Sequence, residues 1–215
     1  KPLRVPLKYF QMARASLYQP FPPRHKLVEL KLPTRPKSLR EVLPDAIKEN
    51  AEWMMNPPIS NFGLKGYLKF KQQFPSWYKK FSADKFLLAL SSTFIYMETG
   101  GSGGAWVRCM YSRFIREAAE ALRKPLLNEA ANTFDEEIKA IRELELAMLP
   151  DELRNLAEIR RTFIETNRVQ EKMESNYRHR IRELDDRLKA AIDSAKDDDY
   201  ARYPAHIPRV QAALQ

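Results

Sequence analysis

The sequence predicts a mainly α-helical protein: a multi-helix bundle with two long C-terminal antiparallel helices and one short N-terminal β-strand. Two observations support this fold class. From residue 38 onward, apolar residues recur three or four positions apart, which is the period of an amphipathic helix. The chain also contains 15 prolines in 215 residues. Because proline removes a helical hydrogen-bond donor, these residues mark where one predicted helix ends and the next begins.

The chain is expected to comprise three regions. Residues 1–36 are interpreted as the tail of a missing N-terminal α/β domain, or as a linker, and they include the strand. Residues 37–199 form the predicted helical domain, and residues 200–215 a polar C-terminal tail with a weakly helical end. The chain opens on Lys-Pro without an initiating methionine, which favours the interpretation that it is a fragment.

The predicted strand lies at residues 26–32, KLVELKL. Val28, Leu30 and Leu32 fall on one face and charged residues on the other, the period of a half-buried strand. A lone strand leaves its backbone donors and acceptors unpaired. We therefore expect this strand to pair with a sheet outside the chain, in upstream sequence or in a neighbouring copy.

The helical domain begins with a capping box, in which Ser38 accepts from the backbone N–H of Glu41 and the Glu41 side chain reaches back. A second, short helix covers residues 61–74 and is predicted to end at Pro75. Two further stripes flank a group of glycines: Phe86, Leu90, Phe94 and Met97 before it, and Trp106, Met110, Phe114, Ala118 and Leu122 after it. The glycines are therefore expected to join two helices.

Beyond Pro125 the stripes become longer. They are Phe134, Ile138, Ile141, Glu145 and Met148; then Leu153, Leu156, Ile159 and Phe163; and then Tyr177, Ile181, Leu184, Leu188 and Ala191. The last stripe alternates spacings of four and three, which is typical of a seam between paired helices. This pattern predicts the two long antiparallel helices.

The glycine group does not match a known phosphate loop. Four of the six glycines in the chain fall within residues 100–104. A Walker-type loop needs Lys and Ser or Thr directly after its last glycine, but Ala105 and Trp106 stand there. The dinucleotide fingerprint needs a preceding strand and a third glycine, and Trp106 occupies the place of that glycine.

Two interpretations of this turn remain. In the first, Ser102, Gly103 and Gly104 open a helix whose free N–H groups bind an anion, helped by Arg108 one turn later. In the second, the glycines only reverse the chain between packed helices, and at least one of them adopts a positive φ. The second is favoured, because no other feature of the sequence converges on the turn.

The charge of the chain is unevenly distributed. Residues 1–126 carry 22 Lys and Arg against 9 Asp and Glu, and residues 127–199 carry 13 against 19, within a net charge of +9. A basic half can attract nucleic acid, or it can complement an acidic region of the same chain or of a partner.

Aromatic residues interleave with lysines over residues 65–81, which gives the alternative function of a basic helical nucleic-acid-binding module. At helical spacing such rings are more typical of a core, so nucleic acid is the less favoured partner.

No catalytic residue, metal or cofactor is predicted. Cys109 has no evident base, because the histidines, His25, His179 and His206, lie in other segments of the sequence and no motif brings one of them to it. The carboxylates at residues 135–137 are interpreted as a solvated helix face, and no His/Cys cluster has the spacing of metal ligands. The single cysteine and the lack of a long apolar run favour a cytoplasmic protein without membrane contact.

Four segments carry a resemblance to a known family. They read ENAEWMMNPP, NFGLKGYLKF, FPSWYKKF and IYMETGGSGGAWVRCMYSRFIREAAE. Their order resembles the helical domain that follows the N-terminal domain in proteins similar to butirosin biosynthesis protein H. The matching positions are Asn50, Pro57, Pro58, Gly63, Gly66, Trp77, Glu98, Gly101, Gly103, Gly104, Arg108, Tyr111 and Phe114, while Ser102 replaces an expected threonine. The resemblance covers about residues 1–125, and the later helices only in outline.

The resemblance implies a function for the chain. The N-terminal domain of that family is similar to cysteine peptidases and, in the butirosin case, moves an acyl group from a carrier-protein thioester to an aminoglycoside amine. Cys109 does not match the position of the family's nucleophile. The chain is therefore expected to be a non-catalytic helical companion that shapes substrate or carrier-protein binding.

The expected partners and contact residues complete these expectations. The expected partners are the N-terminal catalytic-like domain, an acyl carrier protein and further copies of the chain. The candidate anion or substrate contacts are Ser102, Gly103, Gly104, Arg108 and Tyr111.

Overall fold

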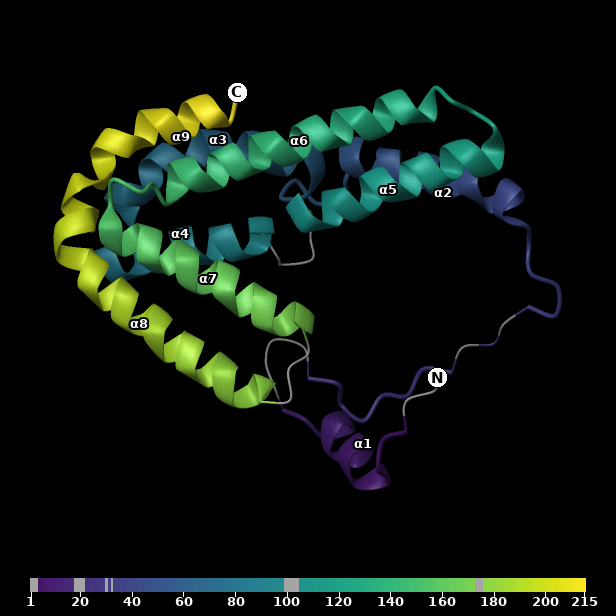
Figure 1. Ribbon diagram of the computed structural model, residues 1–215, viewed down its shortest axis with the longest axis horizontal. Coiled ribbons are helices and arrows are strands. Elements are labelled where there is room, and N and C mark those ends of the chain that lie inside the picture. Colours follow the sequence, from purple (N-terminus) through teal and green to yellow (C-terminus); the bar gives the residue numbers. More distant parts are fainter. Residues whose placement is uncertain (1–3, 18–21, 30, 32, 99–104, 173–175) are drawn as a thin grey trace. The chain divides into compact units, whose positions relative to one another are not determined.

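The computed structural model describes residues 4–17, 22–29, 31, 33–98, 105–172 and 176–215 (Figure 1). The chain divides into two compact units, Lys1–Ser38 and Leu39–Gln215. The second unit contains, in chain order, α2 (Leu39–Met55), α3 (Gly63–Lys80), α4 (Ala83–Glu98), α5 (Ala105–Leu122), α6 (Leu127–Met148), α7 (Arg154–Lys172), α8 (Tyr177–Arg202), the 3-10 helix η1 (Tyr203–His206) and α9 (Ile207–Ala213). The predicted mainly α-helical fold is confirmed.

The first unit has one short helix and no buried core among its described residues. This helix, α1 (Leu7–Arg14), contains no buried side chain. Arg14 and His25 tie its end to the following loop: the His25 backbone N–H donates to the Arg14 carbonyl at 3.0 Å, and the Arg14 guanidinium donates to the His25 carbonyl. These local hydrogen bonds, rather than apolar packing, shape the segment.

The predicted strand at residues 26–32 is wrong. The described residues of this stretch, 26–29 and 31, form no regular structure, and the Val28 side chain is 78% exposed. An alternating pattern specifies a strand only where a second strand accepts its hydrogen bonds. The described residues of the chain supply no such partner, so residues 26–29 and 31 stay irregular and exposed.

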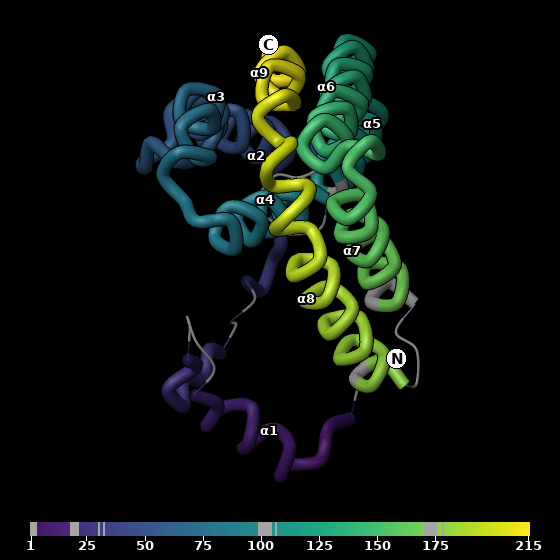
Figure 2. Tube along the Cα trace, turned by 90° about the vertical axis from the view of Figure 1, so that its left-hand side faces the viewer, coloured from purple at the N-terminus to yellow at the C-terminus, as the bar shows by residue number. Residues whose placement is uncertain are grey.

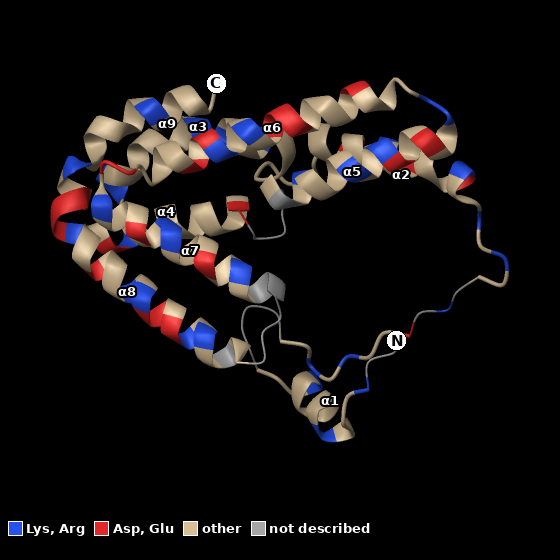
Figure 3. Cartoon of the chain, in the orientation of Figure 1, with Lys and Arg blue, Asp and Glu red and all other residues tan. Residues whose placement is uncertain are grey.

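Two helical hairpins form the larger part of the second unit. In Figure 2, α5 lies beside α6 and α7 lies beside α8, and each pair is in close contact along its length. The α7–α8 pair is the predicted pair of long antiparallel helices, and Leu156, Ile159 and Leu184 are buried in its seam. Charges of both signs line these helices (Figure 3), and Glu165 accepts from Arg180 and Arg187 at 2.6 Å each. The hairpin therefore has an apolar seam and a paired polar rim.

The core lies where α4 meets α6, α7 and α8. The predicted α4 stripe is confirmed, since Phe86, Leu90, Phe94 and Met97 are all at most 8% exposed. Phe86 packs edge-on against the buried Tyr203 ring, with centroids 4.9 Å apart. The helix period therefore identified the face of α4 that is buried.

The observed face of α5 differs from the predicted one. The helix forms, but Met110 is 52% exposed, while Arg108, Ser112 and Ile115 are at most 5% exposed. A stripe that repeats every four residues turns by about 40° per step around a helix, because one turn takes 3.6 residues. The observed face follows alternating spacings of four and three instead, so it stays on one side and faces α6.

Two predicted helix ends also differ. Helix α3 continues through Pro75 to Lys80, because Phe74 and Trp77 on either side of the proline pack on each other at 5.7 Å and hold the later turn in the core. The C-terminal segment is not a polar loop: residues 200–215 are largely helical, and Tyr203 and Val210 are fully buried. No helix of the described residues is long and apolar enough to cross a membrane.

Candidate functional site

A buried cation, a carboxylate and a phenol meet where α3, α5 and α6 come together. The Arg108 side chain on α5 is only 5% exposed, and its Nε lies 2.6 Å from Oε1 of Glu137 on α6. The Arg108 guanidinium also lies over the Tyr67 ring of α3, 5.6 Å from the centroid. A cation beside a ring and a carboxylate is stabilised by both, so the trio joins three helices.

The surroundings of Tyr67 keep its phenol neutral. Burial raises the pKa of Tyr67, the Arg108 charge lowers it, and the Glu137 carboxylate raises it again, with a net upward shift. A neutral phenol can donate a hydrogen bond to an oxygen of a ligand. The Tyr67 hydroxyl is therefore a hydrogen-bond donor beside an ion pair, Arg108 and Glu137, whose charges balance.

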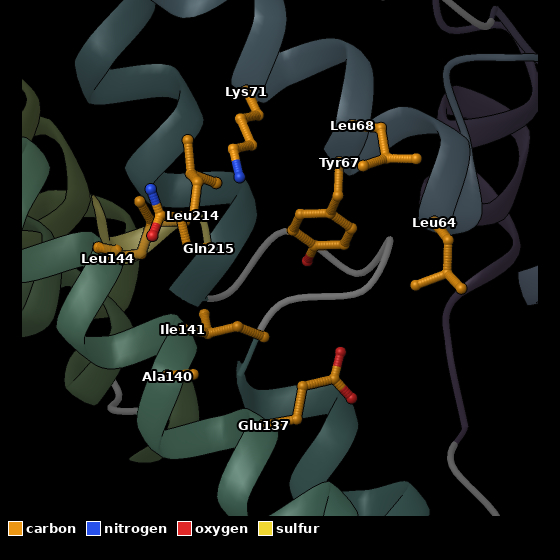
Figure 4. A pocket seen from close by; sticks show the side chains of 11 residues that line it. Leu64, Tyr67, Leu68, Lys71, Glu137, Ala140, Ile141, Leu144, Leu214 and Gln215 are labelled. Atoms are coloured by element: carbon orange, nitrogen blue, oxygen red, sulfur yellow. The ribbon is translucent and has the colours of Figure 1, made fainter. Parts of the chain in front are cut away.

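An open cavity of about 310 Å³ adjoins this trio (Figure 4). Its walls come from α3, α6 and the last residues of the chain, and they include Leu64, Leu68, Ile141, Leu144 and Leu214. Figure 4 shows two polar groups of α3 directed into the cavity, the Lys71 ammonium and the Tyr67 hydroxyl. An apolar pocket with a few convergent polar groups is the usual form of a small-molecule site.

Lys71 supplies the uncompensated charge of this cavity. The Arg108 charge is balanced by Glu137, whereas Lys71 has no ion pair to any residue that the structure describes. Lys71 is half-buried. The cavity therefore favours a ligand with an apolar body and one anionic group.

The predicted contact residues are only partly placed. Ser102, Gly103 and Gly104 lie outside the described residues. Arg108 belongs to the site, as part of the ion pair with Glu137. Tyr111 does not line the cavity; its ring packs edge-on against Phe134 of α6, with centroids 4.8 Å apart. Anion binding at the glycine turn stays a prediction.

Sequence reasoning missed the other members of the site. Tyr67 was expected to be a core aromatic residue and Glu137 part of a solvated face. A usable signal was present for Glu137, which stands three residues after Phe134 and four before Ile141 and so falls in the buried register of α6. For Lys71 no such signal exists, because its cavity is completed by the C-terminal segment.

Metal binding and the reactivity of Cys109 were the other chemical possibilities that the sequence raised. No group of three or more His, Cys, Asp or Glu side chains is placed there to hold a metal ion. Cys109 is a free thiol that packs, half-buried, against the hydrophobic core.

The aromatic residues of the 65–81 window pack on one another. The ring centroids of Phe70, Phe74 and Trp77 lie 5.4 to 5.7 Å apart. Nucleic-acid binding through this window stays a prediction.

Comparison with known proteins places the chain in a family. No curated protein and no solved structure matches it significantly. A family model described as a domain of unknown function (DUF4872) matches residues 8–191, which spans α1 to the later part of α8. The match covers most of the chain, and the chain therefore belongs to the DUF4872 family.

Proposed function

We propose that residues 39–215 form a non-catalytic ligand-binding domain of an acyltransferase-like protein similar to butirosin biosynthesis protein H. In this proposal, the cavity between α3, α6 and the C-terminal segment takes the acylated phosphopantetheine arm of a carrier protein. The reacting nucleophile belongs to an N-terminal catalytic-like domain, with which this chain acts. Self-association of the chain belongs to the same proposal.

The observation that carries the proposal is the position of Lys71 against an apolar wall. An acyl-phosphopantetheine arm has an apolar acyl end and one phosphate, and it matches a cavity that has leucine walls and one uncompensated ammonium. The volume of about 310 Å³ lies at the lower end of small-molecule sites, which suits a short acyl chain. The Tyr67 hydroxyl can donate to an oxygen of the arm.

Arg108 and Glu137 have a supporting role in this proposal. Their ion pair fixes α5 against α6 and holds the Tyr67 ring at the edge of the cavity. Because the two charges compensate each other, a ligand that reaches them need not bring a counter-charge. Arg108 therefore orients Tyr67, and Lys71 is the group that contacts the phosphate.

Isothermal titration calorimetry with two matched ligands tests the proposal. Butyryl-pantetheine 4′-phosphate is expected to bind more tightly than butyryl-pantetheine, which lacks only the phosphate. Lys71→Met should weaken binding of the phosphate ligand by about tenfold, the effect of one charge-assisted hydrogen bond, and leave the other ligand unaffected.

Lys79→Met is the matched control, since Lys79 lies on the same helix, is exposed and does not line the cavity. It should bind both ligands like the wild type. If the two ligands bind equally, or if Lys79→Met weakens binding as much as Lys71→Met, the cavity does not recognise a phosphate and the proposal fails.

A further inference from the structure

A second cavity, of about 230 Å³, opens on a different face of α6. It lies between α4, α6 and α7. Its apolar wall consists of Phe94, Leu146 and Ile164, and two carboxyl groups, those of Glu98 and Glu145, line it from α4 and α6. The sequence separates these two carboxyl groups by 47 positions, and packing of α4 on α6 brings them to one cavity.

Glu145 is the more buried of the two carboxyl groups in this cavity. The residue is 5% exposed and is hydrogen-bonded to the Glu98 carboxyl, while its Oε1 has no partner among the hydrogen bonds of the described part of the chain. A buried carboxylate oxygen without a donor loses the hydration that stabilised it in water. A ligand that brings N–H donors to this oxygen would recover that free energy.

The charges around Glu145 favour a cation as the ligand. Arg160 of α7 does not neutralise Glu145, because its Nη1 donates to the Leu149 carbonyl at 2.7 Å and its Nη2 to Asp151 at 2.5 Å. The exposed Arg142 on α6 supplies one positive charge against the two carboxyl groups. Arg160 also lines the cavity and is paired with Asp151. Counted with Asp151, the groups at the cavity carry one negative charge in excess when both carboxyl groups are ionised, which a monovalent cation would balance.

The protonation of the pair points the same way. Burial, together with the neighbouring Glu98 carboxyl, raises the pKa of Glu145 to about 8, and Arg142 only partly offsets this. Near neutral pH the two carboxyl groups therefore hold one proton between them. A cation that enters can take the place of that proton.

The apolar wall decides which cation fits. Calcium and magnesium need six or more oxygen ligands, and two carboxyl groups beside Phe94 and Ile164 do not provide them. An ammonium ion is strongly hydrated, whereas a guanidinium ion is planar, weakly hydrated and able to donate to two carboxylates while its faces rest on apolar side chains. Of these cations, guanidinium loses least on leaving water for this cavity.

We propose that the cavity between α4, α6 and α7 binds a guanidinium group, which donates to the carboxylates of Glu98 and Glu145. The alkyl body of the ligand lies against Leu146 and Ile164. Binding leaves both carboxyl groups ionised, so the shared proton is released to the solvent. The guanidinium group belongs either to a small guanidine compound or to an arginine side chain of a partner protein.

Calorimetry of the 215-residue chain with ethylguanidinium chloride at pH 7 tests this site. Ethylurea has nearly the same shape without the charge, and ethylammonium has the charge without the planar donor set. Ethylguanidinium should bind at least about tenfold more tightly than either. The heat of binding should differ between PIPES and ACES buffers by an amount that corresponds to about one released proton.

Glu145→Gln keeps the shape of the side chain and removes its charge. This variant should bind ethylguanidinium at least about tenfold more weakly and release no proton. Glu143→Gln is the matched control, because Glu143 lies on α6, is exposed and does not line the cavity. Thermal denaturation of both variants establishes that they are folded.

The relative affinities of the three ligands and of the two variants decide whether the site recognises a guanidinium group. The proposal is overturned if ethylurea or ethylammonium binds as tightly as ethylguanidinium, or if Glu145→Gln binds like the wild type. If binding is found, N-acetyl-argininamide separates the two sources: affinity equal to that of ethylguanidinium indicates an arginine side chain of a partner, and weaker binding indicates a small guanidine compound.

Discussion

The hydroxyl of Tyr203 donates a hydrogen bond of 2.9 Å to the carbonyl oxygen of Met148, and both residues are fully buried. Met148 is the last residue of α6, so its carbonyl is one of those that a helix end leaves without an intrahelical partner. The C-terminal segment thus satisfies the end of a helix that lies 55 residues earlier in the chain.

Replacement of Tyr203 by Phe should reduce the free energy of unfolding by about 1 to 2 kcal/mol, because a buried carbonyl then loses its donor while the ring packing remains. Urea denaturation measures the change. Tyr200→Phe is the comparison, since the Tyr200 hydroxyl is only partly buried and donates to the Tyr78 carbonyl at a longer 3.2 Å. An equal or larger loss for Tyr200→Phe would contradict the role assigned to the Tyr203 hydroxyl.

Gly63, at the start of α3, has a φ of +59°, and a Cβ there would lie 2.2 Å from the Met54 carbonyl oxygen. We expect Gly63→Ala to destabilise the protein by about 1 to 3 kcal/mol, because both the left-handed backbone and the close approach disfavour a side chain. Ser60→Ala, at an exposed position of the same loop, should cost less than about 0.5 kcal/mol. Thermal or urea denaturation that leaves Gly63→Ala as stable as wild type would exclude this conformation in solution.

Glu145 should make the protein less stable as the pH rises. Burial and the Glu98 carboxyl raise its pKa from 4.5 in the unfolded chain to about 8, so the folded state binds the extra proton between these values. The free energy of unfolding should fall across this range, by at most about 1.4 kcal/mol per pH unit for one proton. Urea denaturation of wild type and Glu145→Gln at pH 5 to 8 measures the difference, and parallel pH profiles would refute the assignment.

Asp135 should have the opposite effect, at acidic pH. Arg116 and Ser112 of α5 donate to the Asp135 carboxylate at 2.5 and 2.6 Å, and these hydrogen bonds lower its pKa below 3.8. The stabilising contribution is complete above pH 3.8 and is lost as the pH falls through the lowered pKa. Asp135→Asn should therefore lose less stability than wild type between about pH 4 and 2. A pH titration monitored by circular dichroism tests this, with Glu136→Gln on the solvent side as control.

The isolated chain should not turn over acyl thioesters. Cys109 is half-buried against the core, and the sequence places no evident base beside it. Release of thiol from a butyryl thioester should therefore proceed at the uncatalysed rate. Turnover that disappears in Cys109→Ala, while the thermal stability of that variant stays close to wild type, would show that the chain has its own nucleophile.

The spacing of apolar residues predicted most of the helices. It gave wrong results where the structure depends on a second segment, such as a pairing strand or the partner of a buried charge. The stripe from Phe86 to Met97 identified the buried face of α4, because burial of one face is the property that produces such a stripe. The same reasoning gave a strand at residues 26–32, for which the described residues of the chain supply no neighbour to pair with. It also chose a stripe on α5 that includes the exposed Met110 rather than the buried Arg108. Arg108 can lie on the buried face of α5 because its charge is paired with Glu137 of α6, and the sequence of α5 alone does not show this partner.

The sequence by itself determined that this chain is helical, which stripes of α4, α6, α7 and α8 are apolar, and that its charge is unevenly distributed. Tertiary structure alone decided where the polar groups meet. Lys71 borders a cavity because the C-terminal segment closes one side of it, and Glu145 meets Glu98 because α4 packs on α6. The physical reason is that helix formation depends on residues three or four apart. The pKa of a carboxyl group and the polarity of a cavity depend on burial and on charges contributed by distant parts of the chain.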